Sequence, residues 1–434
     1  MHTNGEINAF IKQKKNSKQM TILIIALIIA LLLLSWKYIL KLEPAGVFAA
    51  MWAFFAGAVM LLQNQIEQRY EGQIFVLSNV MVFVMGTIFC DTIYQPEETG
   101  KKLELKKGWI TPVLIVLIAG AIVNPIYSIA LHGFSLQALL SMQDLLNMNR
   151  AISEDRYYTG EAYSVINQFF LIFSYAAPVI GGFCYRMVGK LNKTLCIITL
   201  IPGTFIALTQ SMKMVMMTSF ILWFASYIVC SYSYHLPIHI KPKVILRFVL
   251  IILGFFFVLF ISMVFRTGEV SERTILDISQ KFVTYALGHM HCIDMWYTTY
   301  TPAELAWGSK SFMGISNLLG IEERVQGIYP EYLNIGKNGF YGISNVYTIF
   351  RPLVEDVGEV GTMIVMFFMG FISNYSFKNI ITHRFLFINQ VVVIAIFAYL
   401  MWSFVASFYA YTSYLAMFFL IYFILRFIQK ESIS

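Results

Sequence analysis

The sequence predicts an all-α polytopic membrane protein, and composition and apolar runs are the observations that predict it. Of its 434 residues, 58% are hydrophobic and only 13% are charged, compared with roughly 45–50% and about 25% in soluble domains. Residues 21–34 and 244–264 are apolar on every face and carry almost no charge. About 20 such residues in a helix cross the hydrocarbon core. A β-barrel would instead alternate apolar and polar residues.

Apolar windows place eleven spans along the chain. They cover residues 20–38, 44–62, 73–93, 109–131, 161–185, 194–210, 212–232, 244–264, 357–377, 385–406 and 409–427. One missed or split span would make the total twelve. We therefore expect an N-terminal transmembrane bundle over 1–264, a long extracytoplasmic loop over 265–356, and C-terminal spans with a tail over 357–434.

Basic residues in the connections set the predicted orientation. The loops after the fifth span, before the eighth and after the ninth contain basic residues and no acids, and they alternate correctly for one cytoplasmic face. The basic residues assigned to that face are Arg186, Lys190, Lys193, Lys241, Lys243, Arg247, Lys378 and Arg384, with Lys101, Lys102, Lys106, Lys107, Arg426 and Lys430. The C-terminus is thus predicted to be cytoplasmic. The net charge of +7 reflects these loops, and nucleic acid is not an expected partner.

The N-terminus conflicts with this orientation. Four lysines before the first span favour the cytoplasm, namely Lys12, Lys14, Lys15 and Lys18. Eleven spans that end inside would nevertheless start outside. Either a span is missed in the first hundred residues, or the later helices overrule these charges.

Two polar regions, 132–160 and 266–356, fall on the outer side. In the longer region, residues 276–296 carry apolar side chains at helical spacing, which predicts a helix lying at the membrane surface. The region is rich in Tyr, Trp and Gly. This composition argues against disorder.

Three cations lie at the outer ends of predicted spans, where the positive-inside rule does not favour them. They are Lys213, Arg266 and Arg351. The planar fork of Arg and the compact charge of Lys both suit a diphosphate. The alternative is that each cation reaches lipid headgroups from a helix end.

Arg150 and Arg156 lie in the shorter outer region and could extend this basic rim. Their alternative role is pairing with Glu154 and Asp155 in a solvated loop.

Titratable side chains near these cations are candidates for proton transfer. His289 and His291 lie close to Asp294, but His residues at i and i+2 point to different faces of a helix, so no metal site is expected. One His could act as a general base, or could simply hydrogen bond at the interface. Asp356 either caps the ninth span or takes part in catalysis. No nucleotide-binding motif is present, and no cofactor is expected.

The junction at residues 345–358 reads Asn-Val-Tyr-Thr-Ile-Phe-Arg-Pro-Leu-Val-Glu-Asp-Val-Gly and precedes an apolar span. It resembles the oligosaccharide repeat-unit polymerases of bacterial surface polysaccharides, the Wzy-type O-antigen and capsule polymerases. The turn at 209–213 is similar to one that carries a diphosphate-binding Arg in such polymerases and in O-antigen ligases, but here Lys213 occupies it. The Arg-x10-Gly pattern of some polymerase loops is not reproduced, because neither Arg266 nor Arg273 has Gly at that spacing.

The resemblance implies glycosyl transfer between undecaprenyl-diphosphate-linked glycans at the outer face of a bacterial cytoplasmic membrane. It implies that the diphosphate is held by cations and that His289, His291 or Asp356 takes the proton. The aromatic faces it would offer to sugars are those of Tyr285, Trp296 and Tyr347. Expected partners are the lipid-linked glycan and membrane lipid, with a repeat-unit flippase and a chain-length regulator as candidate protein partners.

Three alternatives stay open. A flippase or transporter for the same glycans should line a path with polar side chains on several helices, but only Asn167, Gln168 and Ser174 stand out within the spans. An O-antigen-ligase-like transferase would move finished glycan to another acceptor. A membrane-embedded sensor would perform no chemistry.

Overall fold

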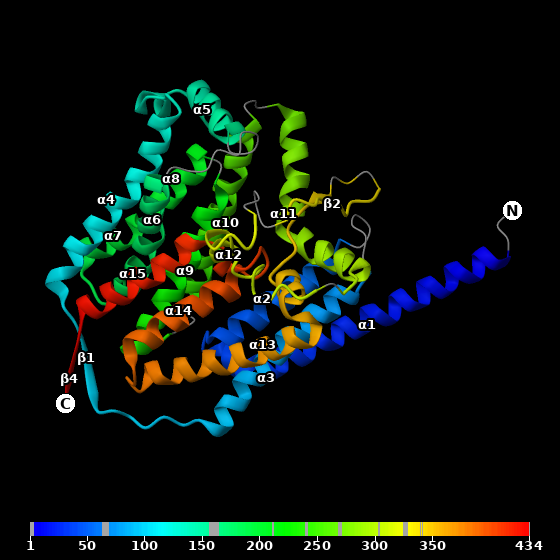
Figure 1. Cartoon of the computed structure of the whole chain (residues 1–434), viewed down its shortest axis with the longest axis horizontal. Coiled ribbons are helices and arrows are strands. Elements are labelled where there is room, and N and C mark those ends of the chain that lie inside the picture. The colour runs from blue at the N-terminus through cyan, green and yellow to red at the C-terminus, as the bar shows by residue number, and fades with distance from the viewer. Residues whose placement is uncertain are drawn as a thin grey trace.

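The computed structural model is mostly helical (Figure 1). It describes residues 4–62, 69–155, 165–210, 212–238, 242–267, 271–302, 304–323, 329–338, 340 and 342–433. Within these ranges, 7 helices are long and apolar enough to cross a membrane. The predicted multi-pass helical class is therefore confirmed.

All eleven predicted apolar segments fall on helices. The 7 long apolar helices are Lys18–Leu40 within α1 (Asn4–Leu40), α3 (Glu71–Ile93), α4 (Lys107–Leu131), α6 (Val165–Cys184), α7 (Lys190–Ile198) with α8 (Ile201–Gln210), α9 (Lys213–Ser233) and α13 (Phe350–Ile381). Shorter apolar helices are α2 (Pro44–Met60), Phe256–Phe265 within α10 (Pro242–Thr267), α14 (Leu386–Trp402) and α15 (Thr412–Ile428). Among the described residues of the first hundred, no further span appears, so an extra helix does not explain the N-terminal lysines.

The remaining elements are short helices, strands and the long helix α11. They are η1 (Leu136–Leu140), α5 (Met142–Glu154), α11 (Glu272–Thr299), α12 (Met313–Leu318), η3 (Phe408–Ala410) and the antiparallel strand pairs β1 (Lys101–Leu105) with β4 (Gln429–Ile433) and β2 (Leu333–Asn334) with β3 (Ile343–Ser344). α13 begins at Phe350, inside the loop predicted for 265–356. α11 packs against α2, α3 and α13. The predicted loop is thus partly built into the bundle.

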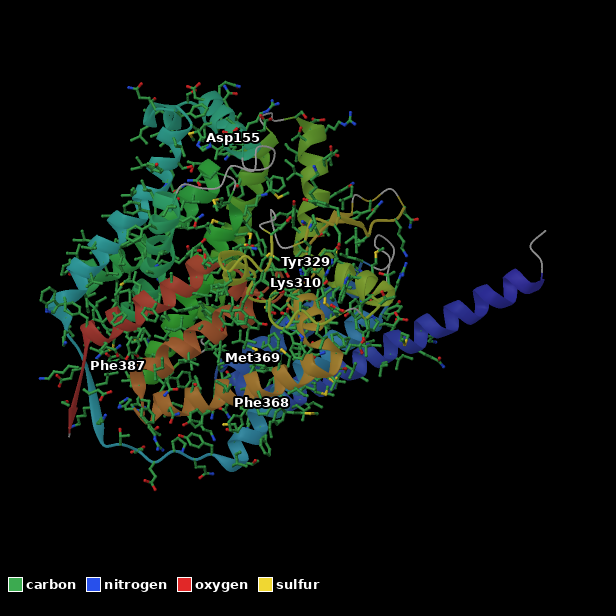
Figure 2. The ribbon with its side chains drawn as sticks, viewed as in Figure 1. Asp155, Lys310, Tyr329, Phe368, Met369 and Phe387 are labelled. Carbon is green, nitrogen blue, oxygen red and sulfur yellow. The ribbon has the colours of Figure 1, made fainter. Side chains whose placement is uncertain are left out.

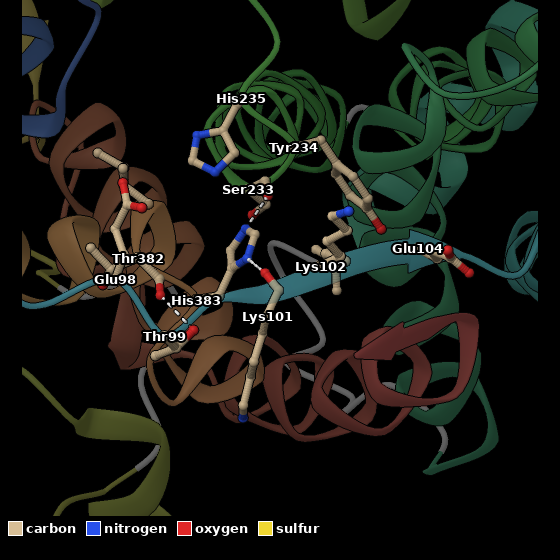
Figure 3. Close-up of a pocket in the computed structure, with 13 residues that line it drawn as sticks. Glu98, Thr99, Lys101, Lys102, Glu104, Ser233, Tyr234, His235, Thr382 and His383 are labelled. Carbon is tan, nitrogen blue, oxygen red and sulfur yellow. Dashed lines mark hydrogen bonds between the residues drawn. The ribbon is translucent and has the colours of Figure 1, made fainter. Parts of the chain in front are cut away.

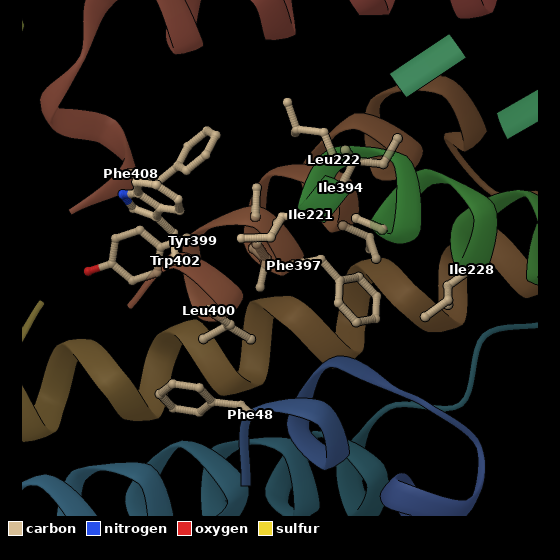
Figure 4. Packing of buried hydrophobic residues seen from close by; sticks show 14 of the residues in the cluster. Phe48, Ile221, Leu222, Ile228, Ile394, Phe397, Tyr399, Leu400, Trp402 and Phe408 are labelled. Atoms are coloured by element: carbon tan, nitrogen blue, oxygen red, sulfur yellow. The ribbon is translucent and has the colours of Figure 1, made fainter. Parts of the chain in front are cut away.

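One apolar core joins the early and late helices. Phe48 from α2, Leu222 from α9, Phe397 and Trp402 from α14, and Phe408 from η3 are all fully buried (Figure 4). The first and last parts of the predicted division therefore share a core.

α3 and α13 cross at a pair of glycines. A Cβ at Gly86 would lie 2.0 Å from the carbonyl oxygen of Phe367, and a Cβ at Gly370 would lie 2.0 Å from that of Phe83. Only residues without a side chain allow two helices to approach so closely. The hydroxyl of Thr87 also donates to the carbonyl oxygen of Gly370 at 3.2 Å. This crossing fixes the position of α13 against α3.

The predicted cytoplasmic connections gather at one end of the bundle. Antiparallel pairing of β1 with β4 joins the lysine cluster at 101–107 to the C-terminal tail. His383, after α13, places its ring nitrogens 2.7 Å from the carbonyl oxygen of Lys101 and 2.8 Å from that of Ser233 at the end of α9 (Figure 3). These segments line a hollow of about 490 Å³. At the same end, Lys37 near the C-terminus of α1 pairs with Asp91 of α3 at 2.6 Å.

Candidate functional site

A buried arginine lies at the opposite end of α13. Arg351, in the first turn of this 32-residue helix, is only 5% exposed. Its guanidinium carbon lies 3.7 Å from the ring centroid of Tyr329, 4.3 Å from that of Tyr347 and 5.4 Å from that of Trp296. A guanidinium plane stacks well on aromatic faces. The structure thus brings together three residues that the sequence proposed, and adds Tyr329.

Two carboxylates complete this group. Arg351 donates from Nη2 to Glu331 at 2.6 Å and from Nε to Glu355 at 2.9 Å. The side chain of Glu355 is only 19% exposed, whereas that of Glu331 is 62% exposed. We call Arg351, Glu331, Glu355, Tyr329, Tyr347 and Trp296 the Arg351 cluster.

The two tyrosines hold the cluster in place. Tyr329 donates its hydroxyl to Glu355 at 2.8 Å, and Tyr347 donates to the backbone oxygen of Glu331 at 2.9 Å. Burial raises the pKa of Tyr347 to about 12 and raises that of Tyr329 well above its usual value. Both phenols therefore keep their protons and remain hydrogen-bond donors.

Local chain geometry explains how the cluster assembles. The pairing of β2 with β3 turns the chain back on itself, so that Glu331 lies next to Tyr347. Asn345 strengthens this return by donating its side-chain amide to the carbonyl oxygen of Tyr329 at 3.0 Å. Thr348 has a left-handed φ of 67° and accepts the backbone N–H of Phe350, where α13 begins.

Asp356 anchors a neighbouring loop. Its two oxygens accept the backbone N–H groups of Lys310 at 3.0 Å and Ser311 at 2.8 Å. Gly358, two residues later, has φ 73° and ψ 176°, a conformation open to glycine, and kinks α13. The sequence left capping and catalysis open for Asp356. In the structure it binds backbone amides of another segment, and it is only 1% exposed.

The two histidines proposed as general bases are fully buried. The ring of His289 lies 4.5 Å from that of Phe55, 5.5 Å from Phe404 and 5.8 Å from Trp52, measured between centroids. Neither of its nitrogens has a hydrogen-bond partner among the described residues. Burial lowers the pKa of His289 to about 3. Its imidazole is therefore neutral and enclosed by aromatic rings.

α11 does not lie on the membrane surface along its whole length. Its residues from Gly288 to Asp294 are all buried, and Gly72 of α3 packs directly against the backbone of Asp294. The predicted surface helix over 276–296 is therefore wrong for its second half. The periodicity of the first turns suggested a single apolar face, but the following turns are enclosed on every side.

Asp294 has a role that sequence reasoning missed. Its carboxylate accepts the backbone N–H groups of Arg69 at 2.7 Å, Tyr70 at 2.8 Å and Gly72 at 2.9 Å. It thereby caps the N-terminus of α3, where an anion also complements the helix dipole. No signal in the sequence links positions that lie more than 220 residues apart. Within the described residues, no group of His, Cys, Asp and Glu could hold a metal ion.

Of the other proposed ligands, Lys213 and Arg150 have described side chains, and both contact residues outside the Arg351 cluster. Lys213, the first residue of α9, places its ammonium 5.5 Å from the ring centroid of Tyr285 on α11. Arg150 pairs with Glu154 at 2.8 Å on exposed α5, as its alternative role predicted. Arg266 belongs to α10, but its side chain lies outside the described residues, as does Arg156.

Side-chain amides, most of them buried, lie next to the turn that carries Lys213. Asn124, Asn167, Gln168 and Gln210 line a small cavity of about 30 Å³ between α4, α6 and α8. Asn124 donates to the carbonyl oxygen of Asn167 at 2.9 Å. The cavity has room for one water molecule. The sequence singled out Asn167 and Gln168 but not the amides that join them from other helices.

Comparison with known proteins assigns no family to the chain. No protein-family model, curated protein or solved structure matches it. The functional assignment therefore rests on the residues of this chain.

Proposed function

We propose that this protein polymerises undecaprenyl-diphosphate-linked oligosaccharide repeat units into a surface polysaccharide, at the outer face of a bacterial cytoplasmic membrane. The observation that carries this proposal is the Arg351 cluster. It combines a cation suited to a diphosphate, a solvent-exposed carboxylate and aromatic rings at one end of a multi-pass helical bundle. The junction that resembles repeat-unit polymerases contributes Tyr347, Arg351 and Glu355 to it.

The distribution of basic residues supports the orientation. The lysine cluster at 101–107 and the C-terminal tail meet where β1 pairs with β4, and α13 leads from that end, through its kink at Gly358, to Arg351. If the basic end is cytoplasmic, the Arg351 cluster faces outward and the C-terminus lies inside. The N-terminus of α1 then starts outside, so the later loops overrule Lys12, Lys14 and Lys15.

The cluster suggests how a diphosphate could bind. The carboxylate of Glu355 accepts hydrogen bonds from both Arg351 and Tyr329. The carboxylate of Glu331 is largely exposed and binds Arg351, whereas Tyr347 binds only the backbone oxygen of Glu331. Diphosphate oxygens would therefore replace the Glu331 carboxylate on Arg351. For Lys213 and Arg266, the role of phosphate ligand stays a prediction from the sequence.

The released Glu331 would then act as the proton acceptor. A hydroxyl oxygen of the acceptor sugar forms a bond to the anomeric carbon of the donor. The bond from that carbon to the diphosphate oxygen breaks, and its electron pair leaves with the diphosphate. The hydroxyl proton passes to Glu331, and Arg351 neutralises the developing charge. His289, His291 and Asp356 are too enclosed for this role in the present conformation.

The test is a reconstituted reaction. Purified protein in liposomes, supplied with the lipid-linked repeat unit, should produce a ladder of longer glycans. Glu331→Gln should slow ladder formation by about 10²–10⁴-fold, the usual contribution of a general base. Glu323→Gln, at an exposed carboxylate of the same outer region, is the matched control and should leave the ladder unchanged.

Other outcomes would redirect the assignment. Movement of the lipid-linked glycan across the bilayer without a ladder would favour the flippase. Transfer of a finished glycan to a different acceptor, again without a ladder, would favour the ligase-like transferase. Equal ladders from the native protein and Glu331→Gln would remove Glu331 from the proton-transfer step.

A further inference from the structure

The segment around α12 has an unusually apolar outward surface. Residues 305–321, which we call the apolar loop, include seven exposed large hydrophobic side chains: Leu305, Trp307, Phe312, Ile315, Leu318, Leu319 and Ile321. Trp307 is 80% exposed and Leu318 is 78% exposed. Apolar side chains crowded this densely mark an interaction surface rather than ordinary scatter.

The polar groups of this loop point inward or are neutralised. Asp356 accepts two of its backbone N–H groups, as described above. Lys310 pairs with Glu322 at 2.8 Å, and Ser309 donates its hydroxyl to the same carboxylate at 2.6 Å. The carbonyl oxygen of Ser311 accepts the hydroxyl of Ser407, in the connection between α14 and α15, at 2.8 Å. The outward face of the loop is therefore mainly apolar.

This face continues the lipid-facing stripe of α13. Val360, Ile364, Phe368 and Ile372 recur every four residues on one side of that helix, and all are exposed. At the N-terminal end of the stripe, a side-chain carbon of Leu305 lies 3.8 Å from the position that a Cβ on Gly358 would occupy. In Figure 2, Lys310 lies beside the start of α13, and Phe368 marks the stripe farther along the helix. The membrane that covers α13 would thus reach the apolar loop.

We propose that the apolar loop inserts its side chains into the outer leaflet of the bilayer, so that its binding partner is the acyl region of the membrane. Trp and aliphatic side chains are favoured at this boundary. The loop is also tied to the Arg351 cluster, because Ala306 donates its backbone N–H to the carbonyl oxygen of Glu355 at 2.9 Å. Trp307 donates in the same way to Asp356 at 3.0 Å. The loop therefore fixes the depth of the cluster relative to the lipid surface. This inference does not depend on the proposed polymerase activity.

Spin-label accessibility in lipid bilayers tests the proposal. The five native cysteines are all buried, so a nitroxide label can be directed to an introduced cysteine in the full-length protein. Leu318→Cys probes the loop, Ile364→Cys serves as the lipid-facing control on α13, and Glu97→Cys, in the exposed polar segment between α3 and β1, serves as the water-facing control. Ile321→Cys is a second loop variant, used if Leu318→Cys does not fold.

The expected result is that the loop label behaves like the label at position 364. It should collide several-fold more often with oxygen, which concentrates in hydrocarbon, than with a water-soluble nickel complex. A collision ratio equal to that at position 97 would overturn the proposal. Dipolar broadening between loop labels would also overturn it, because a second copy of the chain would then cover the surface.

Discussion

The two ends of α13 hold opposite kinds of charge cluster. Near its C-terminus, the carboxylate of Asp91, on α3, lies within 3.0 Å of four side-chain donors. Two of them come from α1 and two from α13: Lys37, Tyr38, Asn374 and Lys378. Near its N-terminus, the single guanidinium of Arg351 lies between two carboxylates and three aromatic rings.

The two clusters differ in whether a bound ligand could replace one of the partners of the central charged group. Donors from two other helices occupy both oxygens of Asp91, which locks α1, α3 and α13 together. Arg351 has one partner, Glu331, that is largely exposed, and its Nη1 has no hydrogen-bond partner among the described residues. A carboxylate with saturated oxygens suits a structural role, whereas a cation with one replaceable partner suits binding of an anion.

Arg351→Ala should have the largest effect. It removes the proposed phosphate ligand and leaves two carboxylates without their cation, so we expect no detectable glycan ladder and a loss of about 3–5 kcal/mol in stability. Arg351→Lys is the control, because it keeps the charge and loses the fork. It should retain a weak ladder. A normal ladder from Arg351→Ala would remove the distinction between the two clusters.

Gly370→Ala should disturb both clusters together. The added methyl group would collide with the backbone of Phe83 and push α13 away from α3. Overpacking costs about 1–3 kcal/mol, and both thermal stability and polymer length should fall. Gly57→Ala in α2 is the control, since a Cβ there meets nothing within 4 Å. If the two variants melt at the same temperature, the close α3–α13 crossing does not hold α13 in place.

Asp91→Asn should separate stability from activity. It leaves Lys37 and Lys378 without their anion, and we expect a loss of about 2 kcal/mol, reduced from the fully buried case because the site is partly exposed. Protein that remains folded should still form a full ladder. Glu97→Gln, at an exposed carboxylate near the same end, should change neither property. Loss of the ladder at unchanged melting temperature would assign Asp91 a direct part in the reaction.

Glu43→Gln should have the smallest effect on activity, and an effect on stability that depends on pH. Burial of Glu43 in the α1–α2 connection, opposed by the Lys41 ammonium, raises the pKa of its carboxyl from 4.5 to about 7. Between these pH values the folded protein holds a proton that the unfolded chain releases, so stability falls as pH rises through this window. Gln removes this cost. The melting temperature of the variant should match that of the native protein near pH 4.5 and exceed it by a few degrees above pH 7.

A constant difference between the two proteins across that pH range would show that Glu43 does not titrate as its burial implies.

Much of the fold could be predicted from sequence because apolar runs act locally. Twenty uncharged residues need lipid and must satisfy their own backbone, whatever the rest of the chain does. The site was only partly predictable. Arg351 and Tyr347 were recognised in one short junction, but Tyr329 and Glu331 reach it through the β2–β3 return, which is only two residues long in each strand.

Sequence reasoning failed where a role depends on distant partners. His289 and Asp356 have side chains suited to proton transfer, yet aromatic rings enclose the first and backbone amides bind the second. Asp294 binds the start of α3, although the two are separated by 224 residues of sequence. No local pattern reports such contacts.

Hydrophobicity and charge along the chain are enough to predict a helical, multi-pass membrane protein with basic connections on alternate loops, because both act on each segment separately. Tertiary structure decided which polar side chains meet. The β2–β3 return brings Tyr329 and Glu331 to Arg351, and packing leaves Glu331 open to solvent while His289 is buried. Side-chain burial, and whether an ion-pair partner can be replaced, depend on residues that are distant in the sequence and meet only in the folded chain.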